Sequence, residues 1–143
     1  MNNLTDKQRA YVESHHQAAM ITIGEDGIPK AVRVAVAVVD GKLWSSGTAG
    51  RVRTERLRTN PACTLYLIDP GYSFLTLETT VRLIEGPDVP ALSVKLFRTM
   101  QNMPTGDIAW FGKPMPEADF MAAMAADHRL IYEFEVTRAY GAT

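Results

Sequence analysis

Residues 19–46 read AMITIGEDGIPKAVRVAVAVVDGKLWSS, and this stretch decides the fold. It contains three β-rich runs, Ala19–Ile23, Lys30–Val39 and Lys42–Ser46, which are separated by the pairs Asp26-Gly27 and Asp40-Gly41. An Asp-Gly pair between two such runs is a strong signal of a β-hairpin, because both residues tolerate a positive φ. The stretch therefore predicts three consecutive antiparallel strands.

The rest of the chain extends this pattern to six strands. Further strands are expected at Ala62–Ile68, Tyr72–Glu85 and Arg129–Val136, and helices at Asp6–His15, at the arginine-rich run before Asn60, after Asp88 and at Glu117–Ala126. Residues 101–116, which include Trp110-Phe111, are expected to form a long loop. Parallel strands would need a crossover after almost every strand, whereas hairpins dominate here. We therefore predict a mainly β fold, a six-stranded antiparallel split barrel with inserted helices, in one domain over residues 1–143.

Composition places the chain among soluble globular proteins. Its 143 residues are 46% hydrophobic and 22% charged, with a net charge of −1. A nucleic-acid binder usually carries a broader excess of positive charge. There is one cysteine, Cys63, and we find neither a signal peptide nor an apolar stretch of membrane-spanning length. We expect a cytoplasmic protein that binds neither nucleic acid nor membrane.

The strand Lys30–Val39 has two unlike faces. One face carries valines at 32, 34, 36 and 38, and the other carries Arg33 among alanines at 31, 35 and 37. A face of small side chains leaves room for a flat ring or for another subunit. It is equally compatible with tight packing inside a small barrel.

The segment after Ser46 has the features of an anion site. Gly47-Thr48-Ala49-Gly50 forms a small-residue turn before a short helix that contains four arginines, Arg51, Arg53, Arg56 and Arg58. The start of a helix presents unpaired N–H groups and partial positive charge, and guanidinium groups suit phosphate oxygens. Hydroxyl groups of Ser46, Thr48 and Thr54 lie in the same segment. The alternative is a basic helix that simply faces solvent.

Motifs of other catalytic classes are missing from the sequence. It has no G-x-x-x-x-G-K-[ST], no G-x-G-x-x-G after a parallel strand and no G-x-S-x-G. The three histidines are not spaced as a metal set, so no metal is expected, and Cys63 lies within a strand, where packing is its expected role. No catalytic side chain can be named; solvent or Tyr72 are the only suggestions for a proton donor. Any chemistry is therefore expected to come from a bound cofactor.

Several motifs together resemble the pyridoxamine-phosphate-oxidase-like split β-barrel superfamily, and in particular its branch that depends on the deazaflavin coenzyme F420. They are Met20-Ile21-Thr22-Ile23, Asp26-Gly27-Ile28-Pro29, the valine-alanine strand, Arg51-Val52-Arg53-Thr54 through Asn60-Pro61, Asp127-His128-Arg129 and Arg138-Ala139-Tyr140-Gly141. The similarity extends over nearly the whole chain. It implies the split-barrel fold and a homodimer with cofactor sites between the two protomers.

The resemblance also implies the site residues. Arg53 and Thr54 match the positions that contact the cofactor phosphate, Arg51 precedes them, and Ser46 matches a strand end near the phosphate. Lys30 and Arg33 match the strand beside the ring system. We add Thr48 from the turn. This chain has Arg56 where many members have Asn, and Arg33 where an amide is frequent, so F420 and FMN both stay open as cofactor.

The function that the resemblance implies is that of an oxidoreductase. It would bind F420, or alternatively FMN, and transfer a hydride to a small unsaturated or conjugated substrate. A hypothesis of another class is a non-catalytic protein that binds or carries a cofactor or haem. The long chain and C-terminal substrate segment of true pyridoxamine phosphate oxidases are not found, so that activity is not expected.

Overall fold

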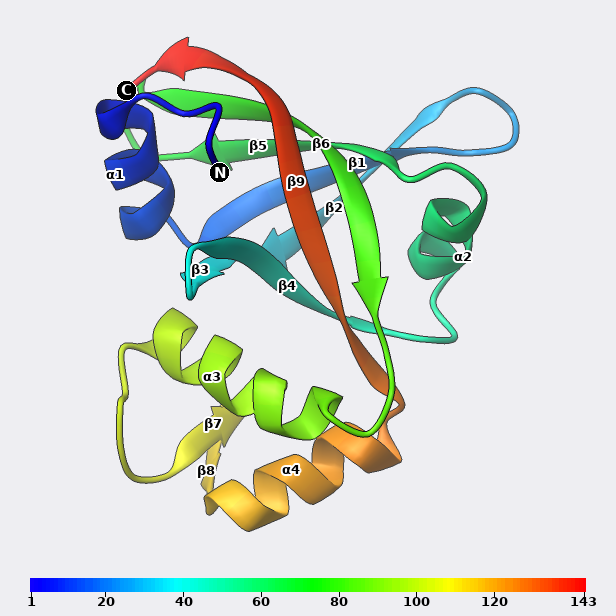
Figure 1. The fold of residues 1–143 in the computed structure, drawn as a ribbon, viewed down its shortest axis with the longest axis vertical. Helices are drawn as coiled ribbons and strands as arrows, with labels where there is room; N and C mark the ends of the chain where they lie inside the picture. Colours follow the sequence, from blue (N-terminus) through cyan, green and yellow to red (C-terminus); the bar gives the residue numbers. More distant parts are fainter.

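The computed structural model describes residues 1–143, and its main feature is a curled antiparallel sheet of seven strands (Figure 1). In chain order the elements are α1 (Asp6–Ser14), β1 (Gln17–Ile23), β2 (Pro29–Ala35), β3 (Ala37–Val39), β4 (Lys42–Thr48), α2 (Val52–Thr59), β5 (Ala62–Ile68), β6 (Phe74–Ile84), α3 (Val89–Gln101), β7 (Ile108–Trp110), β8 (Lys113–Met115), α4 (Glu117–Ala126) and β9 (Arg129–Ala142). The strand order is β2-β1-β5-β6-β9-β4-β3. The mainly β antiparallel barrel is confirmed. No helix has both the length and the apolar character needed to cross a bilayer.

One hydrophobic core fills the inside of the curled sheet. It is made by alternate residues of the strands, among them Met20, Leu65, Leu77 and Phe134, none of which is more than 2% exposed. Helix α1 covers one end of this core and α2 lies at the opposite end (Figure 1). The predicted start of α1 is confirmed: the Gln8 amide donates to Thr5 Oγ1, and the Thr5 amide donates to Gln8 Oε1.

A second core lies between the sheet and a layer made of α3, α4 and the β7–β8 hairpin (Figure 1). Phe97, Trp110 and Phe120 form an aromatic cluster in this layer, with ring centroids 4.9–6.3 Å apart. Ile131 of β9 and Ala37 of β3 face it from the sheet. The region expected as a loop therefore contains a small hairpin that is anchored by aromatic packing.

The prediction of six strands was wrong, because the run Lys30–Val39 is divided at Val36. Its first part, β2, pairs with β1, and its last part, β3, pairs with β4. The peptide between them bonds elsewhere: the Val36 amide donates to His16 O at 2.8 Å, and His16 Nδ1 donates to Val36 O at 2.9 Å. The break also changes the alternation, since both Val36 and Ala37 are fully buried. Ala37 therefore packs under α3 and does not belong to the open alanine face.

Strand β9 is six residues longer than predicted, ending at Ala142 instead of Val136. The register with β6 shifts between Glu78 and Thr79, so that Thr137 is an extra residue in β9. In β9 before the bulge, the even-numbered residues from Leu130 to Val136 face the core of the barrel. After the bulge it is an odd-numbered residue, Ala139, that packs against this core. A change of face within one strand interrupts the period of two that identifies strands.

Candidate functional site

The turn that follows β4 is built by main-chain bonds and by Thr54. Thr48 O accepts from the Arg51 amide at 3.2 Å and from Thr54 Oγ1 at 2.8 Å. Arg51 is the N-cap residue of α2, but its side chain makes no capping bond. The amides of Val52 and Arg53 have no acceptor within the protein, so the start of α2 keeps donors for a ligand.

The buried hydroxyl groups of Thr54 and Tyr132 support this turn from inside the protein. The Thr54 side chain is fully buried, and because its hydrogen goes to Thr48 O, it accepts the hydrogen of the Tyr132 hydroxyl. The ring of Tyr132 lies directly against Gly47, where a Cβ atom would overlap it. Thr54 therefore positions the turn, and its hydroxyl is already used inside the protein.

A cleft of about 230 Å³ opens beside the turn, where four elements of the barrel meet. Three arginines line it, Arg33 from β2, Arg53 from α2 and Arg129 at the start of β9. Ser46 of β4 lies among them, and the α3 side chains Phe97 and Met100 form the facing wall. No carboxylate lines the cleft. We call it the arginine cleft.

The three guanidinium groups have few partners of their own. Arg53 Nε is buried with no acceptor, and the guanidinium of Arg53 lies 5.9 Å from the centroid of the Tyr132 ring. Arg33 donates from Nε to Gln17 Oε1 at 3.0 Å, and has no ion pair. Arg129 pairs with Asp127 at 2.7 Å. The cleft therefore collects guanidinium groups whose donors are only partly used within the protein, an arrangement that suits an anion.

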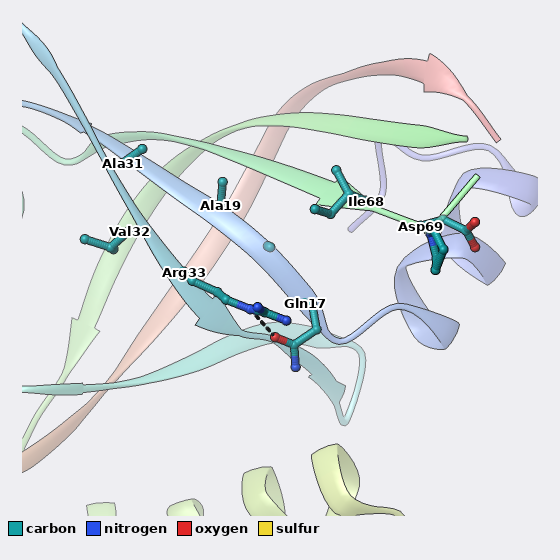
Figure 2. A pocket seen from close by; sticks show the side chains of 9 residues that line it. Gln17, Ala19, Ala31, Val32, Arg33, Ile68 and Asp69 are labelled. Atoms are coloured by element: carbon teal, nitrogen blue, oxygen red, sulfur yellow. Dashed lines mark hydrogen bonds between the residues drawn. The ribbon is translucent and has the colours of Figure 1, made fainter. Parts of the chain in front are cut away.

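A second cavity, of about 580 Å³, lies on the outer face of β1 and β2. Its walls include Ala19, Ala31 and Ile68, and Arg33 lines both this cavity and the arginine cleft. Figure 2 shows Arg33 reaching from β2 to Gln17 beside these small side chains. A ligand with a flat apolar part and an anionic part therefore has two adjoining places to bind.

The predicted site residues do not all meet. The structure brings together Arg33, Ser46 and Arg53, whereas Thr48 is half-buried in the turn and the Arg51 side chain points into solvent without an ion pair. Lys30 lies elsewhere, in a cleft between the β1–β2 hairpin and α2, 3.0 Å from Asp26. The amide of Ile28 and the Lys30 ammonium lower the pKa of the Asp26 carboxyl.

The other two arginines of α2 also point away from the arginine cleft. Arg56 lines the cleft that contains Lys30. Arg58 pairs with Glu85 and with Glu55. Only one arginine of the helix therefore faces the candidate site.

Comparison with known protein families gives a match over most of the chain. The family model described as pyridoxamine 5'-phosphate oxidase matches residues 4–133. The chain belongs to this family. Comparison with curated protein sequences gave no match.

Solved structures share the fold of this pyridoxamine 5'-phosphate oxidase family member. A conserved hypothetical protein from Mycobacterium tuberculosis is 22% identical, with a TM-score of 0.74 over 97% of this chain and 84% of the other. An F420 reductase is 20% identical, with a TM-score of 0.69 over 96% and 98%. A Clostridium acetobutylicum protein of the pyridoxinephosphate oxidase family, related to general stress protein 26, is 19% identical, with a TM-score of 0.62 over 94% and 84%. At these identities the likeness establishes the fold.

Within this family fold, Arg129 is the site residue that the sequence did not predict. It is more than 70 residues from the turn, and it reaches Ser46 only because β9 pairs with β4, with Thr48 opposite Arg129. The sequence carried two signals: Arg129 is a charged residue directly before the apolar run of β9, and it belongs to the Asp127-His128-Arg129 motif, to which no role in the site was given. Neither signal points to the arginine cleft until the pairing of β4 with β9 is known.

Proposed function

We propose that the protein is an oxidoreductase that binds a phosphorylated deazaflavin or flavin, with F420 as the first candidate. The observation that carries the proposal is the arginine cleft, in which three guanidinium groups and Ser46 surround a space without a carboxylate. The family membership and the fold of the F420 reductase support the same class of ligand. When bound, such a cofactor supplies a hydride to a small unsaturated or conjugated substrate.

The residues fit the group by charge and by shape. Arg53, Arg33 and Ser46 would contact the phosphate, together with the free amides at the start of α2. Thr54 would hold the turn in place through its hydrogen bonds to Thr48 O and to Tyr132. Arg51 and Thr48, which belong to the turn itself, would flank the phosphate. The ring would lie against the alanine-lined face of β1 and β2, beside Arg33. In this arrangement the Lys30 side chain lies on the opposite face of β2 from Arg33, in a different cleft, so it would not contact the ring and would act only on an extended acidic tail.

A binding titration tests the proposal. Purified protein is titrated into F420 and into FMN, and the cofactor fluorescence is followed. We expect binding to at least one of them, and Arg53→Ala should weaken it by about 10- to 100-fold, because a hydrogen bond to a charged group is worth about 1.5–3 kcal/mol. Arg58→Ala is the matched control, since Arg58 lies on the same helix but pairs with Glu85. No binding to either cofactor would exclude the proposal.

The second candidate function is that of an FMN-dependent enzyme of the same fold. Competition between F420 and FMN for the protein shows which of the two cofactors it prefers, and so distinguishes this candidate from the first.

The third candidate, of another class, is a protein that carries a cofactor or haem without catalysis. It would bind its ligand with the same dependence on Arg53, but it would reduce none of a panel of enones and quinones. Turnover of any member of the panel would exclude the carrier.

A homodimer is the partner that we propose for this fold. The outer face of the sheet is uncovered, and apolar side chains collect on it, with Tyr66 36%, Ile68 50% and Tyr140 45% exposed. Arg33, Ala19, Tyr66, Thr76 and Tyr140 form one row across five neighbouring strands. The second cavity opens on the same face, so a second copy packed here would enclose the cofactor ring.

Sedimentation equilibrium tests the dimer. Wild-type protein should sediment as a dimer, and Ile68→Asp should be monomeric, because it places a charge in the apolar face. Met103→Asp, on an equally exposed residue away from this face, is the control and should remain dimeric. A monomeric wild type would contradict the arrangement.

A further inference from the structure

Arg129 is fixed in place on three sides by its own neighbours. Its Nε donates to Asp127 Oδ2 at 2.7 Å, and its Nη1 lies 3.4 Å from Ser46 Oγ. Its guanidinium carbon is 4.6 Å from the centroid of the Trp110 ring, within the range of a cation–π contact. The side chain is only 10% exposed. It is therefore held in one orientation before any ligand arrives.

The orientation leaves donors for a ligand. Asp127 accepts the hydrogen bond from Nε, and the ring of Trp110 covers one face of the guanidinium. Nη1 contacts only the hydroxyl of Ser46, and Nη2 has no acceptor in the protein. Both terminal nitrogens thus keep hydrogen atoms for an anion in the arginine cleft, which Arg129 lines. A guanidinium already ordered loses little side-chain entropy on binding.

The charge balance of the cleft also calls for an anion. Arg33, Arg53 and Arg129 contribute three positive charges, and the single carboxylate paired with them, Asp127, contributes one negative charge, which leaves an excess of two. Like charges collected in a partly buried space repel one another and destabilise the free protein. A phosphate group would relieve this repulsion.

Trp110 comes from the layer outside the barrel. It ends β7, immediately before the tight turn of the β7–β8 hairpin, where Phe111 and Gly112 have φ angles of 49° and 76°. It is packed against Phe97 and Phe120, so the hairpin holds the ring at a fixed place over Arg129. The inserted layer thus shapes a site whose other residues come from the barrel.

We infer that Arg129 is a direct ligand of the anionic phosphate group of the cofactor, and that Trp110 and Asp127 are positioning residues that aim its guanidinium into the arginine cleft. The inference rests on the proposed function. It assigns a role in binding to the small layer of α3, the β7–β8 hairpin and α4, and it adds a third arginine to the predicted phosphate site.

The test compares each cofactor with its phosphate-free form, FMN with riboflavin and F420 with its ring-and-ribityl alcohol. Arg129→Met keeps an unbranched apolar stem against Trp110 and removes only the charge and the donors. It should weaken binding of the phosphorylated form by about 10- to 100-fold, the range for one charge-assisted hydrogen-bonded contact, and leave the phosphate-free form within about twofold. Arg129→Lys should recover part of the loss, because it restores the charge without the planar fork.

A variant of a positioning residue gives a second measurement. Trp110→Leu should also weaken the phosphorylated form selectively, but by less than Arg129→Met. In the double variant the two losses should not add, because Trp110 acts through Arg129. Additive losses, or equal losses for both forms of the cofactor, would mean that these residues only maintain the fold, and would overturn the inference.

Failure of the inference is distinguishable from failure of the proposed function. If the wild type binds a cofactor and Arg129→Met binds it equally well, the inference is wrong and the proposed function survives. If the wild type binds neither cofactor, calorimetric titration with pyrophosphate decides. Pyrophosphate binding that is lost in Arg129→Met supports the anion-binding role, and binding that persists in Arg129→Met, or no binding by the wild type, overturns it.

Discussion

Gly47 is the residue at which the structure of the site is most sensitive to a small change. A Cβ atom at this position would lie closer than 3.0 Å to three atoms of the Tyr132 phenol, against a normal carbon contact of about 3.5–4.0 Å. Tyr132 is fully buried, so it cannot swing out into solvent without leaving the core. In the variant Gly47→Ala the ring must therefore shift and break its hydrogen bond with Thr54.

The expected loss of stability follows from two destabilising contributions and one that opposes them. Overpacking of a well-filled core costs about 1–3 kcal/mol. A buried hydroxyl left without its partner costs about 1–3 kcal/mol more. Reduced flexibility of the unfolded chain offsets about 0.4–1 kcal/mol of this. We expect Gly47→Ala to lower the free energy of unfolding by roughly 1–5 kcal/mol.

Urea denaturation followed by circular dichroism measures this change. Gly50→Ala is the matched control, because it lies in the same turn with nothing within 4 Å of the added Cβ atom. It should stay within about 0.5 kcal/mol of the wild type. If Gly47→Ala were as stable as Gly50→Ala, the close approach of Tyr132 to the backbone, and with it the support of the turn by Thr54, would be refuted.

Three further predictions concern other buried or charged groups. Ser93→Ala should raise the free energy of unfolding by about 0.5–1.5 kcal/mol, because the Ser93 hydroxyl is buried without a partner; a loss of stability in urea denaturation would contradict this. Burial by itself raises the pKa of Glu133, but hydrogen bonds from Trp44 and Arg82 outweigh it and lower the pKa below its ordinary value of 4.5. Glu133 should therefore stabilise the protein above that value and lose this contribution as the pH falls, and thermal melts should show a weaker acid dependence in Glu133→Gln than in the wild type. Burial raises the pKa of the Cys63 thiol to about 12, so a thiol reagent at about pH 8 should modify Cys63 only after unfolding, and rapid reaction of the native protein would disprove its burial.

The sequence predicted the fold where local signals carry it. The pair Asp40-Gly41 forms the expected tight turn, with φ angles of 50° and 77°, and the strands that it joins are antiparallel. The break at Val36 was not predictable, because the run is uniformly β-forming. It is fixed instead by two hydrogen bonds to His16, which is 20 residues away.

The site was only partly predictable for a similar reason. Ser46 and Arg53 are near in sequence, whereas Arg129 joins them through the pairing of β4 with β9. The placement of Lys30 beside Arg33 could have been questioned from the sequence alone. Residues three apart in a strand point to opposite faces, and in the structure the two side chains line different clefts.

The division of the strand at Val36 has a consequence for how ligand binding and stability are linked. β2 and β3 are the two outermost strands of the sheet, yet they are consecutive in the chain, so the ring of strands is completed by covalent backbone and not by a ladder of hydrogen bonds. Across the resulting seam the Ser45 hydroxyl donates to Ala35 O at 2.7 Å. The arginine cleft lies over this seam, with Arg33 on one side and Ser46 on the other. An anion that contacts both residues would join the two margins of the sheet, so the barrel could open along this seam only after the anion had left the cleft.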